Sequence, residues 1–230
     1  MSRQAEIFAL FKKADDQLSA IFGTYEASLH QQSIAAPLRV DIKNYCENLR
    51  SILDYLAHDI REKYCPTANQ KERFYFPILP ERTQFLNRTA QWFPGLQNTS
   101  LAVWSILEKR QPYQKGMEWI SHFNRVNNEN KHGNLVPQTR QEKTRIQADI
   151  PGGGGVSWDP ANVKFGSGVF IGGVPVDPKT QMPIPNQNLL VTKTIWVDFL
   201  FDGIGISAIA LLRNALSGVK TINAEIAPHT

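Results

Sequence analysis

Two long stripes of apolar side chains constrain the fold of this chain more than any other feature of its sequence. Apolar residues recur at steps of three or four across residues 3–30, and residues 36–65 repeat the pattern. On an α-helix such spacing gives one continuous apolar face about eight turns long. Two stripes joined by a short polar link predict an antiparallel helical hairpin, whose seam further helices must cover. The first stripe is Ile7, Phe11, Ala14, Leu18, Ile21, Tyr25 and Leu29; the second is Leu38, Ile42, Tyr45, Leu49, Ile52, Leu56 and Ile60.

The residues after this hairpin predict an extended strap and three shorter helices. The segment from Phe74 to Pro80 is aromatic and bounded by prolines, which exclude a helix interior, so we expect it to pack on the bundle as a strap. The middle helix has a cluster of N-capping residues, Asn98, Thr99 and Ser100, at its start. The three helices are expected near residues 81–92, 98–111 and 117–132.

The character of the sequence changes after Gly133. Residues 141–150 and 189–201 are rich in alternating or β-branched apolar residues and predict strands, and the glycine-rich segment 163–176 is strand-like. Loops are expected at 152–155 and 177–188. We therefore predict a mainly α fold, an antiparallel helical bundle of five or six helices with a small antiparallel β insertion at about 141–202. A closing helix at about 204–226 needs the bundle to bury its apolar side, so we expect one domain.

Composition places the chain among ordinary globular proteins, with 42% apolar and 20% charged residues. The net charge of +4 mildly favours anionic partners. Its two cysteines, Cys46 and Cys65, fit reduced thiols in a reducing compartment. No apolar signal segment follows Met1, and the most apolar stretch, 195–216, contains acids and glycines that argue against a membrane span. We expect a cytoplasmic protein with no membrane partner.

The richest polar cluster lies between residues 122 and 134. Arg125 and His132 are seven residues apart, so on a helix they project within about 20° of each other. Glu129 lies between them on the same side of the helix. Because the apolar residues define a different face, we expect this cluster to point toward solvent or toward a second subunit.

Two further polar features accompany the cluster. Asn127 continues the apolar face of the same helix, so we expect a buried amide held in a polar network. A second row, Arg50, Asp54 and His58, recurs every four residues on the second long helix. Either this row is a solvated series of ion pairs, or it contacts the segment 127–132 and orients it.

The arginine and the histidine near a helix end resemble the signature of the HEPN superfamily, in which a few mostly polar residues separate the two. Six residues separate Arg125 from His132, and Val126 stands where many members have an asparagine. The similarity to a group of uncharacterised bacterial proteins extends over roughly residues 36–140. It is carried by Leu49 to Leu56, Phe76-Pro77-Ile78, Gln111-Pro112-Tyr113 and the segment from Asn127 to His132.

The resemblance implies a metal-independent endoribonuclease, of the kind found among toxins and defence-associated proteins. His132 would act as general acid or base, and Arg125 would hold the phosphate. It also implies a homodimer in which the two motifs face each other, RNA as the substrate, no metal or other cofactor, and a protein partner such as an antitoxin. The supporting residues would be Asn127, Asn128, Glu129, Lys131, Arg50 and Asp54.

The residues by themselves fit a second class of function equally well, a non-catalytic helical scaffold or protein-binding module. Lys131 and His132 stand in a last helical turn, where cations interact favourably with the helix dipole. Arg125 and Glu129 form an ordinary pair of opposite charges four residues apart. The spacing of His122, Glu129 and His132 does not match a His-Glu-x-x-His zinc motif, so no metal site is expected there.

Overall fold

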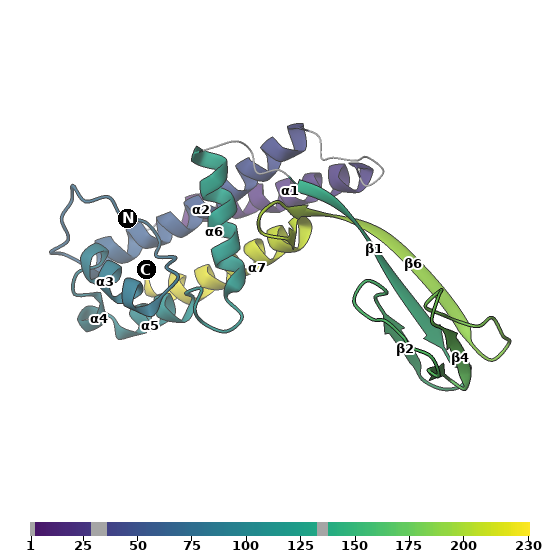
Figure 1. Cartoon of the computed structure of the whole chain (residues 1–230). Coiled ribbons are helices and arrows are strands. Elements are labelled where there is room, and N and C mark those ends of the chain that lie inside the picture. The colour runs from purple at the N-terminus through teal and green to yellow at the C-terminus, as the bar shows by residue number, and fades with distance from the viewer. Residues whose placement is uncertain (1–2, 29–35, 133–137) are drawn as a thin grey trace. The chain divides into compact units, whose positions relative to one another are not determined.

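The computed structural model describes residues 3–28, 36–132 and 138–230, with the backbone alone for residue 28, residues 130–132 and residues 196–197. The chain forms two compact units (Figure 1). The first, here called the helical unit, comprises Met1–Thr139 and Phe199–Thr230. The second, here called the β unit, is Arg140–Asp198.

The described residues form seven α-helices, one 3-10 helix and seven strands. The α-helices are α1 (Gln4–Ser28), α2 (Ala36–Tyr64), α3 (Arg82–Trp92), α4 (Leu96–Thr99), α5 (Leu101–Lys109), α6 (Glu118–His132) and α7 (Ala208–Ile226), and the 3-10 helix η1 is Ala227–His229. The strands are β1 (Gln138–Asp149), β2 (Gly155–Trp158), β3 (Phe170–Ile171), β4 (Val174–Asp177), β5 (Met182–Pro183), β6 (Leu190–Phe201) and β7 (Ile206–Ser207).

The predicted helical hairpin of α1 and α2 is confirmed. Arg3, just before α1, donates from its backbone N–H to Asp59 Oδ2 near the end of α2, at 3.0 Å. Halfway along, Asn48 Nδ2 donates to Gln17 Oε1 at 2.8 Å, so the two helices run antiparallel. All seven apolar residues predicted on the stripe of α2 are buried, as are four on α1, and Leu29 lies outside the described residues. α2 also packs against α6 and α7, which cover the seam of the hairpin.

The strap predicted between Phe74 and Pro80 is extended, and a buried glutamine fixes its backbone. Gln111 is fully buried. Its Oε1 accepts from the backbone N–H of Leu79 at 3.0 Å, and its Nε2 donates to the carbonyl oxygens of Pro77, at 2.9 Å, and Leu107, at 2.8 Å. One side chain thus pairs strap groups that have no ladder partner of their own.

Replacing Gln111 with leucine is expected to lower the free energy of unfolding by about 2–3 kcal/mol, because the strap's N–H and C=O groups stay buried without partners. Urea denaturation measures the loss. Gln91 is a matched control, because its amide donates to Glu72 on the exposed surface, at 2.6 Å. Gln91→Leu is expected to change the free energy of unfolding by less than about 0.5 kcal/mol. Equal effects of the two substitutions would show that Gln111 does not hold the strap.

The structure corrects the predicted helix at 98–111 and the predicted number of helices. Two helices, α4 and α5, replace the single one, and Ser100 separates them. Ser100 Oγ accepts from the N–H of Val103 at 3.4 Å and so caps α5. α5 ends at Lys109, before the expected position. The described chain therefore holds seven α-helices in place of the expected five or six.

The antiparallel β insertion is confirmed, so the chain is mainly helical but is not a pure helical bundle. The sheets have the orders β2-β1-β6-β7 and β3-β4-β5. The long strands β1 and β6 match the prediction, whereas segment 163–176 forms two short strands around a turn at Gly172 and Gly173, both with positive φ. β2 and β5 reach into segments that were predicted to be loops. A small core of its own stabilises the β unit: Ile146, Ala148, Trp158, Ile171, Val174, Val176 and Leu189.

The closing helix α7 returns to the helical unit as predicted but starts later, at Ala208. Ile206 and Ser207 instead pair with the end of β6, and Ser207 Oγ accepts from the N–H of Ala210 at 3.3 Å as the cap of α7. No helix among the described residues is both long enough and apolar enough to cross a membrane. The expected single cooperative domain stays a prediction.

Candidate functional site

The predicted polar cluster lies on α6, which crosses both α2 and α7 (Figure 1). Its inner face buries Ile120, Phe123, Val126 and Asn127. Phe123 and Val126 belong to the apolar face expected from the sequence, whereas Trp119, the third residue of that face, is only partly buried. Helical periodicity then turns the side chain of Arg125 outward, away from that core.

Arg125 is half exposed and is engaged by two neighbours. Its Nε donates to Glu129 Oε1 at 2.7 Å, and the two side chains are 50% and 42% exposed. Its Nη1 donates to the carbonyl oxygen of Gly203 at 3.0 Å, in the turn after β6. Gly203 has φ +70°, and a Cβ there would lie only 3.0 Å from Nη2 of the arginine. The glycine therefore both forms the turn and leaves room for the guanidinium.

His132 is the last residue of α6, and its side chain lies outside the described residues. The helix backbone is continuous from Arg125 to His132, so the two positions are about 20° apart around the axis and roughly 10 Å apart along it. The side-by-side placement of guanidinium and imidazole stays a prediction. The side chain of Lys131 lies outside the described residues as well.

Asn127 is buried as predicted, and its polar network stays a prediction, because the side chains that follow it at 130–132 lie outside the described residues. Only 1% of the residue is exposed, and neither Oδ1 nor Nδ2 has a hydrogen-bond partner among the described residues. A buried polar group without a partner costs about 1–3 kcal/mol. Asn128 is exposed, and Glu129 forms the ion pair with Arg125.

The expectation of a solvated row on α2 is wrong. Arg50 is only 7% exposed and forms an ion pair with Asp54, with Nη2 3.0 Å from Oδ1. Both residues hold the strap: Arg50 Nη2 donates to the carbonyl oxygen of Phe76 at 3.1 Å, and Asp54 Oδ1 accepts from the Phe76 N–H at 2.9 Å. His58 packs on Phe74 with ring centroids 4.5 Å apart, and burial lowers its pKa.

The alternative, in which this row orients the segment 127–132, stays a prediction, because the side chains of residues 130–132 lie outside the described residues. Arg50 reaches α6 through Nη1, which donates to Asn124 Oδ1 at 3.4 Å. Asn124 directly precedes Arg125. Among the described side chains, the row therefore supports α6 one turn before the predicted segment and does not touch Asn127.

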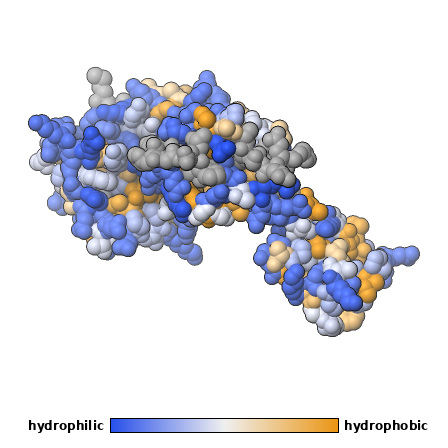
Figure 2. All heavy atoms as spheres, turned by 45° about the horizontal axis from the view of Figure 1, so that its top comes forward, coloured by the Kyte–Doolittle hydropathy of each residue, from blue (hydrophilic) through white to orange (hydrophobic). Residues whose placement is uncertain are grey.

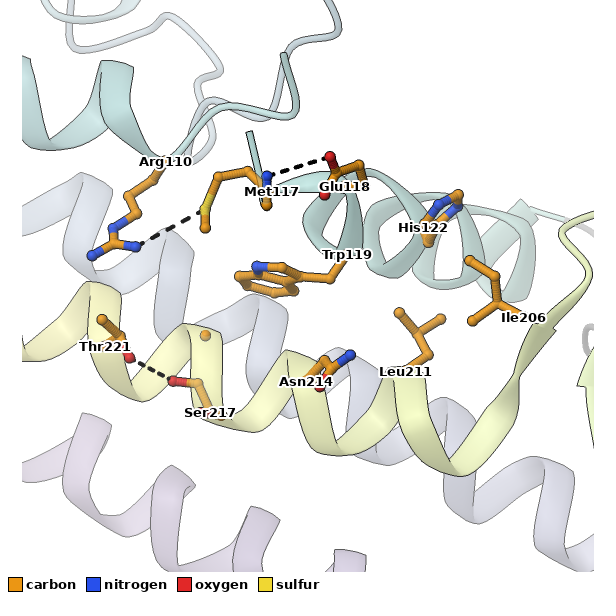
Figure 3. Close-up of a pocket in the computed structure, with 12 residues that line it drawn as sticks. Arg110, Met117, Glu118, Trp119, His122, Ile206, Leu211, Asn214, Ser217 and Thr221 are labelled. Carbon is orange, nitrogen blue, oxygen red and sulfur yellow. Dashed lines mark hydrogen bonds between the residues drawn. The ribbon is translucent and has the colours of Figure 1, made fainter. Parts of the chain in front are cut away.

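A cavity of about 510 Å³ opens between α6 and α7, and the sequence analysis did not predict it (Figure 3). From α6 it is lined by Glu118, Trp119 and His122. Further lining residues are Arg110, Gly116, Met117, Ile206, Leu211, Asn214, Ser217, Gly218 and Thr221. One signal in the sequence could have indicated it, the glycine at position 218 inside an otherwise regular helix.

Gly218 lets the indole of Trp119 approach α7 closely. A Cβ at Gly218 would lie 2.1 Å from Cζ2 of Trp119, well inside contact distance. The ring therefore occupies the space that a side chain would fill. In Figure 3 the indole lies at the centre of the cavity, above the turn of α7 that bears Ser217.

Gly218→Ala is expected to lower the free energy of unfolding by about 1–2 kcal/mol, because overpacking at the indole outweighs the helix propensity gained. The near-ultraviolet circular dichroism of Trp119 should change at the same time. Gly23 on α1 is a matched control, because a Cβ there would meet nothing within 4 Å. Gly23→Ala is expected to increase the free energy of unfolding by about 0.5–1 kcal/mol. A gain at both positions would contradict close packing at Gly218.

The described residues provide neither a reactive cysteine nor a cluster of metal ligands. Both cysteines are buried and unpaired, and burial raises the pKa of Cys46 to about 12 and that of Cys65 to about 11. Both thiols are therefore protonated near neutral pH and are poor nucleophiles. The described side chains contain no group of three His, Cys, Asp or Glu residues placed to hold a metal ion.

Comparison with known proteins identifies no relative from which a function could be proposed. No family model matches the chain, and neither a curated protein nor a solved structure matches it.

Proposed function

We propose that this protein is an endoribonuclease of the HEPN type, which cleaves RNA without a metal through Arg125 and His132. One observation carries the proposal. Arg125 presents a half-exposed guanidinium on the outward face of a helix that continues without interruption to His132. An arginine and a histidine on one helix face would supply the two groups that phosphate binding and proton transfer require.

The reaction needs a 2′-hydroxyl, so the substrate is RNA. His132 takes the proton of the 2′-hydroxyl as its oxygen attacks phosphorus, or delivers a proton to the leaving oxygen. The bond from phosphorus to the 5′-oxygen breaks, the 5′-oxygen leaves as a hydroxyl, and a 2′,3′-cyclic phosphate remains. Arg125 neutralises the charge that grows on the non-bridging oxygens. A homodimer with the two α6 helices facing each other would enclose the phosphate, and an antitoxin-like partner would restrain the activity.

Incubating the purified protein with single-stranded and structured RNA in EDTA tests the proposal. We expect products with cyclic phosphate ends, and a loss of rate of about 10²–10⁴-fold in His132→Ala, the range of general acid–base catalysis. The absence of cleavage, or equal cleavage by the variant, contradicts the proposal. Size-exclusion chromatography with light scattering tests the dimer, and a clean monomer at micromolar concentration contradicts it.

A second candidate function is a non-catalytic scaffold that binds a protein partner. It is favoured by the contacts of Arg125, whose guanidinium is already held by Glu129 and the carbonyl of Gly203. The β unit also shows hydrophobic surface in Figure 2. Its exposed apolar residues include Val156, Phe170, Ile184, Leu190 and Ile195. This function predicts no RNA cleavage and co-purification of one partner with the β unit intact.

A further inference from the structure

The cavity between α6 and α7 has the size and lining of a site for a flat organic group. Its volume of about 510 Å³ falls within the range of small-molecule sites. Trp119 offers an indole ring inside it, and Met117 and Leu211 add apolar surface (Figure 3). An aromatic ring in an open cavity is a stacking platform for another flat ring.

The polar groups around this ring suit the edge of a heterocycle. Asn214 and Ser217 lie on the exposed surface of α7, and Glu118 is exposed on α6 at the other side of the cavity. A carboxamide offers a donor and an acceptor together, which is the pair that adenine presents along one edge. A carboxylate accepts from the amino and imino groups of other bases. This combination matches nucleobases in general.

The charges of the cavity exclude a phosphate as its main occupant. Arg110 is the only lysine or arginine among the lining residues, and Glu225 already engages it. Arg110 Nε donates to Glu225 Oε2 at 2.8 Å, and its Nη2 donates to the other carboxylate oxygen. These hydrogen bonds lower the pKa of Glu225, so the pair is a neutralised unit. A phosphate would find no uncommitted guanidinium here and would find Glu118 nearby.

One end of the cavity is formed by residues close in sequence to Arg125 and to its partner Gly203. On α6, His122 lines the cavity and stands three residues before Arg125, roughly 4.5 Å along the helix. At the same end of the cavity in Figure 3, Ile206 follows by three residues the glycine whose carbonyl accepts from Arg125. A base in the cavity and a phosphate at Arg125 can therefore belong to the same or neighbouring nucleotides.

From this geometry we infer that the cavity binds one nucleobase of the RNA whose scissile phosphate is held at Arg125. The base stacks on Trp119 and is read along its edge by Asn214. The inference rests on the proposed ribonuclease function and adds a base-binding subsite to it. It implies that cleavage shows a preference for the base at one position beside the scissile bond.

Saturation-transfer NMR with adenosine, guanosine, cytidine and uridine tests the subsite without any cleavage, in the His132→Ala protein. We expect transfer to the base protons of at least one nucleoside and its loss in Asn214→Phe, because the new ring fills the cavity. Asn87→Phe is a matched control, because Asn87 is an exposed asparagine on α3 that does not line the cavity. Circular dichroism checks that both variants are folded. Absence of transfer, or equal transfer in both variants, overturns the inference.

A second measurement follows cleavage by the protein with His132 intact. Asn214→Ala is expected to raise KM about tenfold with kcat kept, the effect of losing one base contact, and to flatten the base preference. The two measurements separate the two claims. If Asn214→Phe abolishes nucleoside binding but the protein with His132 intact cleaves no RNA, the result supports the subsite and refutes the ribonuclease. Cleavage with no base preference and no nucleoside binding refutes the subsite alone.

Discussion

Arg50→Met is expected to lower the free energy of unfolding by about 2–4 kcal/mol, because it leaves the Asp54 carboxylate, whose side chain is 26% exposed, without its charge partner and the buried Phe76 carbonyl without its donor. Arg50 is 7% exposed, and its guanidinium binds Asp54, the Phe76 carbonyl and Asn124. A single side chain thus ties α2 to the strap and to α6. Methionine keeps much of the apolar stem but replaces none of these hydrogen bonds. Equilibrium urea denaturation measures the change.

Lys43→Met on the same helix is the matched control. Lys43 Nζ lies 3.2 Å from Glu47 Oε1 in a partly exposed pair, with side chains 30% and 34% exposed. An ion pair of this kind contributes about 0.3–0.5 kcal/mol. If Arg50→Met costs no more than Lys43→Met, the buried network does not stabilise the fold. A further check is Arg50→Met combined with Asp54→Asn, which should recover part of the loss, because the unpaired charge is gone while the amide oxygen can still accept from the Phe76 N–H.

The burial of Arg50 could not be predicted from the sequence. All seven predicted apolar residues of the α2 stripe are buried, and so is Arg50, which does not belong to that stripe. Periodicity describes one helix at a time and cannot tell what covers its flank. The strap covers it here, and Phe76 supplies both a donor and an acceptor to the Arg50–Asp54 pair. A charged residue beside the apolar stripe of a helix is therefore predicted to be exposed, unless the segment that covers it is known.

The break between α4 and α5 has a similar cause. The sequence offers three adjacent capping residues, Asn98, Thr99 and Ser100, any of which suits an N-cap. Thr99 Oγ1 instead donates to the carbonyl oxygen of Tyr64 at 2.9 Å, at the end of α2. A tertiary contact thus engages one candidate, and Ser100 becomes the cap. The short strands β2 and β5 were missed for a related reason, because pairing with β1 and β4 defines them and periodicity does not.

In the candidate site, too, the features that depend on one helix were predicted and those that depend on two helices were not. The outward direction of Arg125 and the burial of Asn127 follow from one helix, and both were predicted. The α6–α7 cavity requires two helices from distant parts of the chain, and Trp119 and Gly218, which pack closely against each other, both line it. Helical periodicity on α6 and on α7 separately could not predict that Trp119 packs against Gly218.

Arg125→Ala is expected to slow RNA cleavage by about 10²–10³-fold, the usual cost of removing a group that stabilises transition-state charge. Arg125→Lys should restore little, because an ammonium cannot match two phosphate oxygens as a guanidinium does. Glu129→Gln should keep the rate or raise it, since the neutral amide no longer competes with phosphate for Nε. Single-turnover cleavage in EDTA measures all three.

The same variants decide between the two candidate functions. For a scaffold, Arg125→Ala and Glu129→Gln both break the exposed pair, which contributes about 0.3–0.5 kcal/mol, and Arg125→Ala also removes the hydrogen bond to the Gly203 carbonyl, with no cleavage in any protein. For a ribonuclease, the cleavage rates of the two variants separate by orders of magnitude. Arg213→Ala controls for the loss of a positive charge, because Arg213 is exposed on α7 and stacks on Phe22, 4.6 Å from the ring centroid. A loss of rate in Arg213→Ala equal to that in Arg125→Ala would mean that overall charge, and not a specific phosphate contact, governs RNA cleavage.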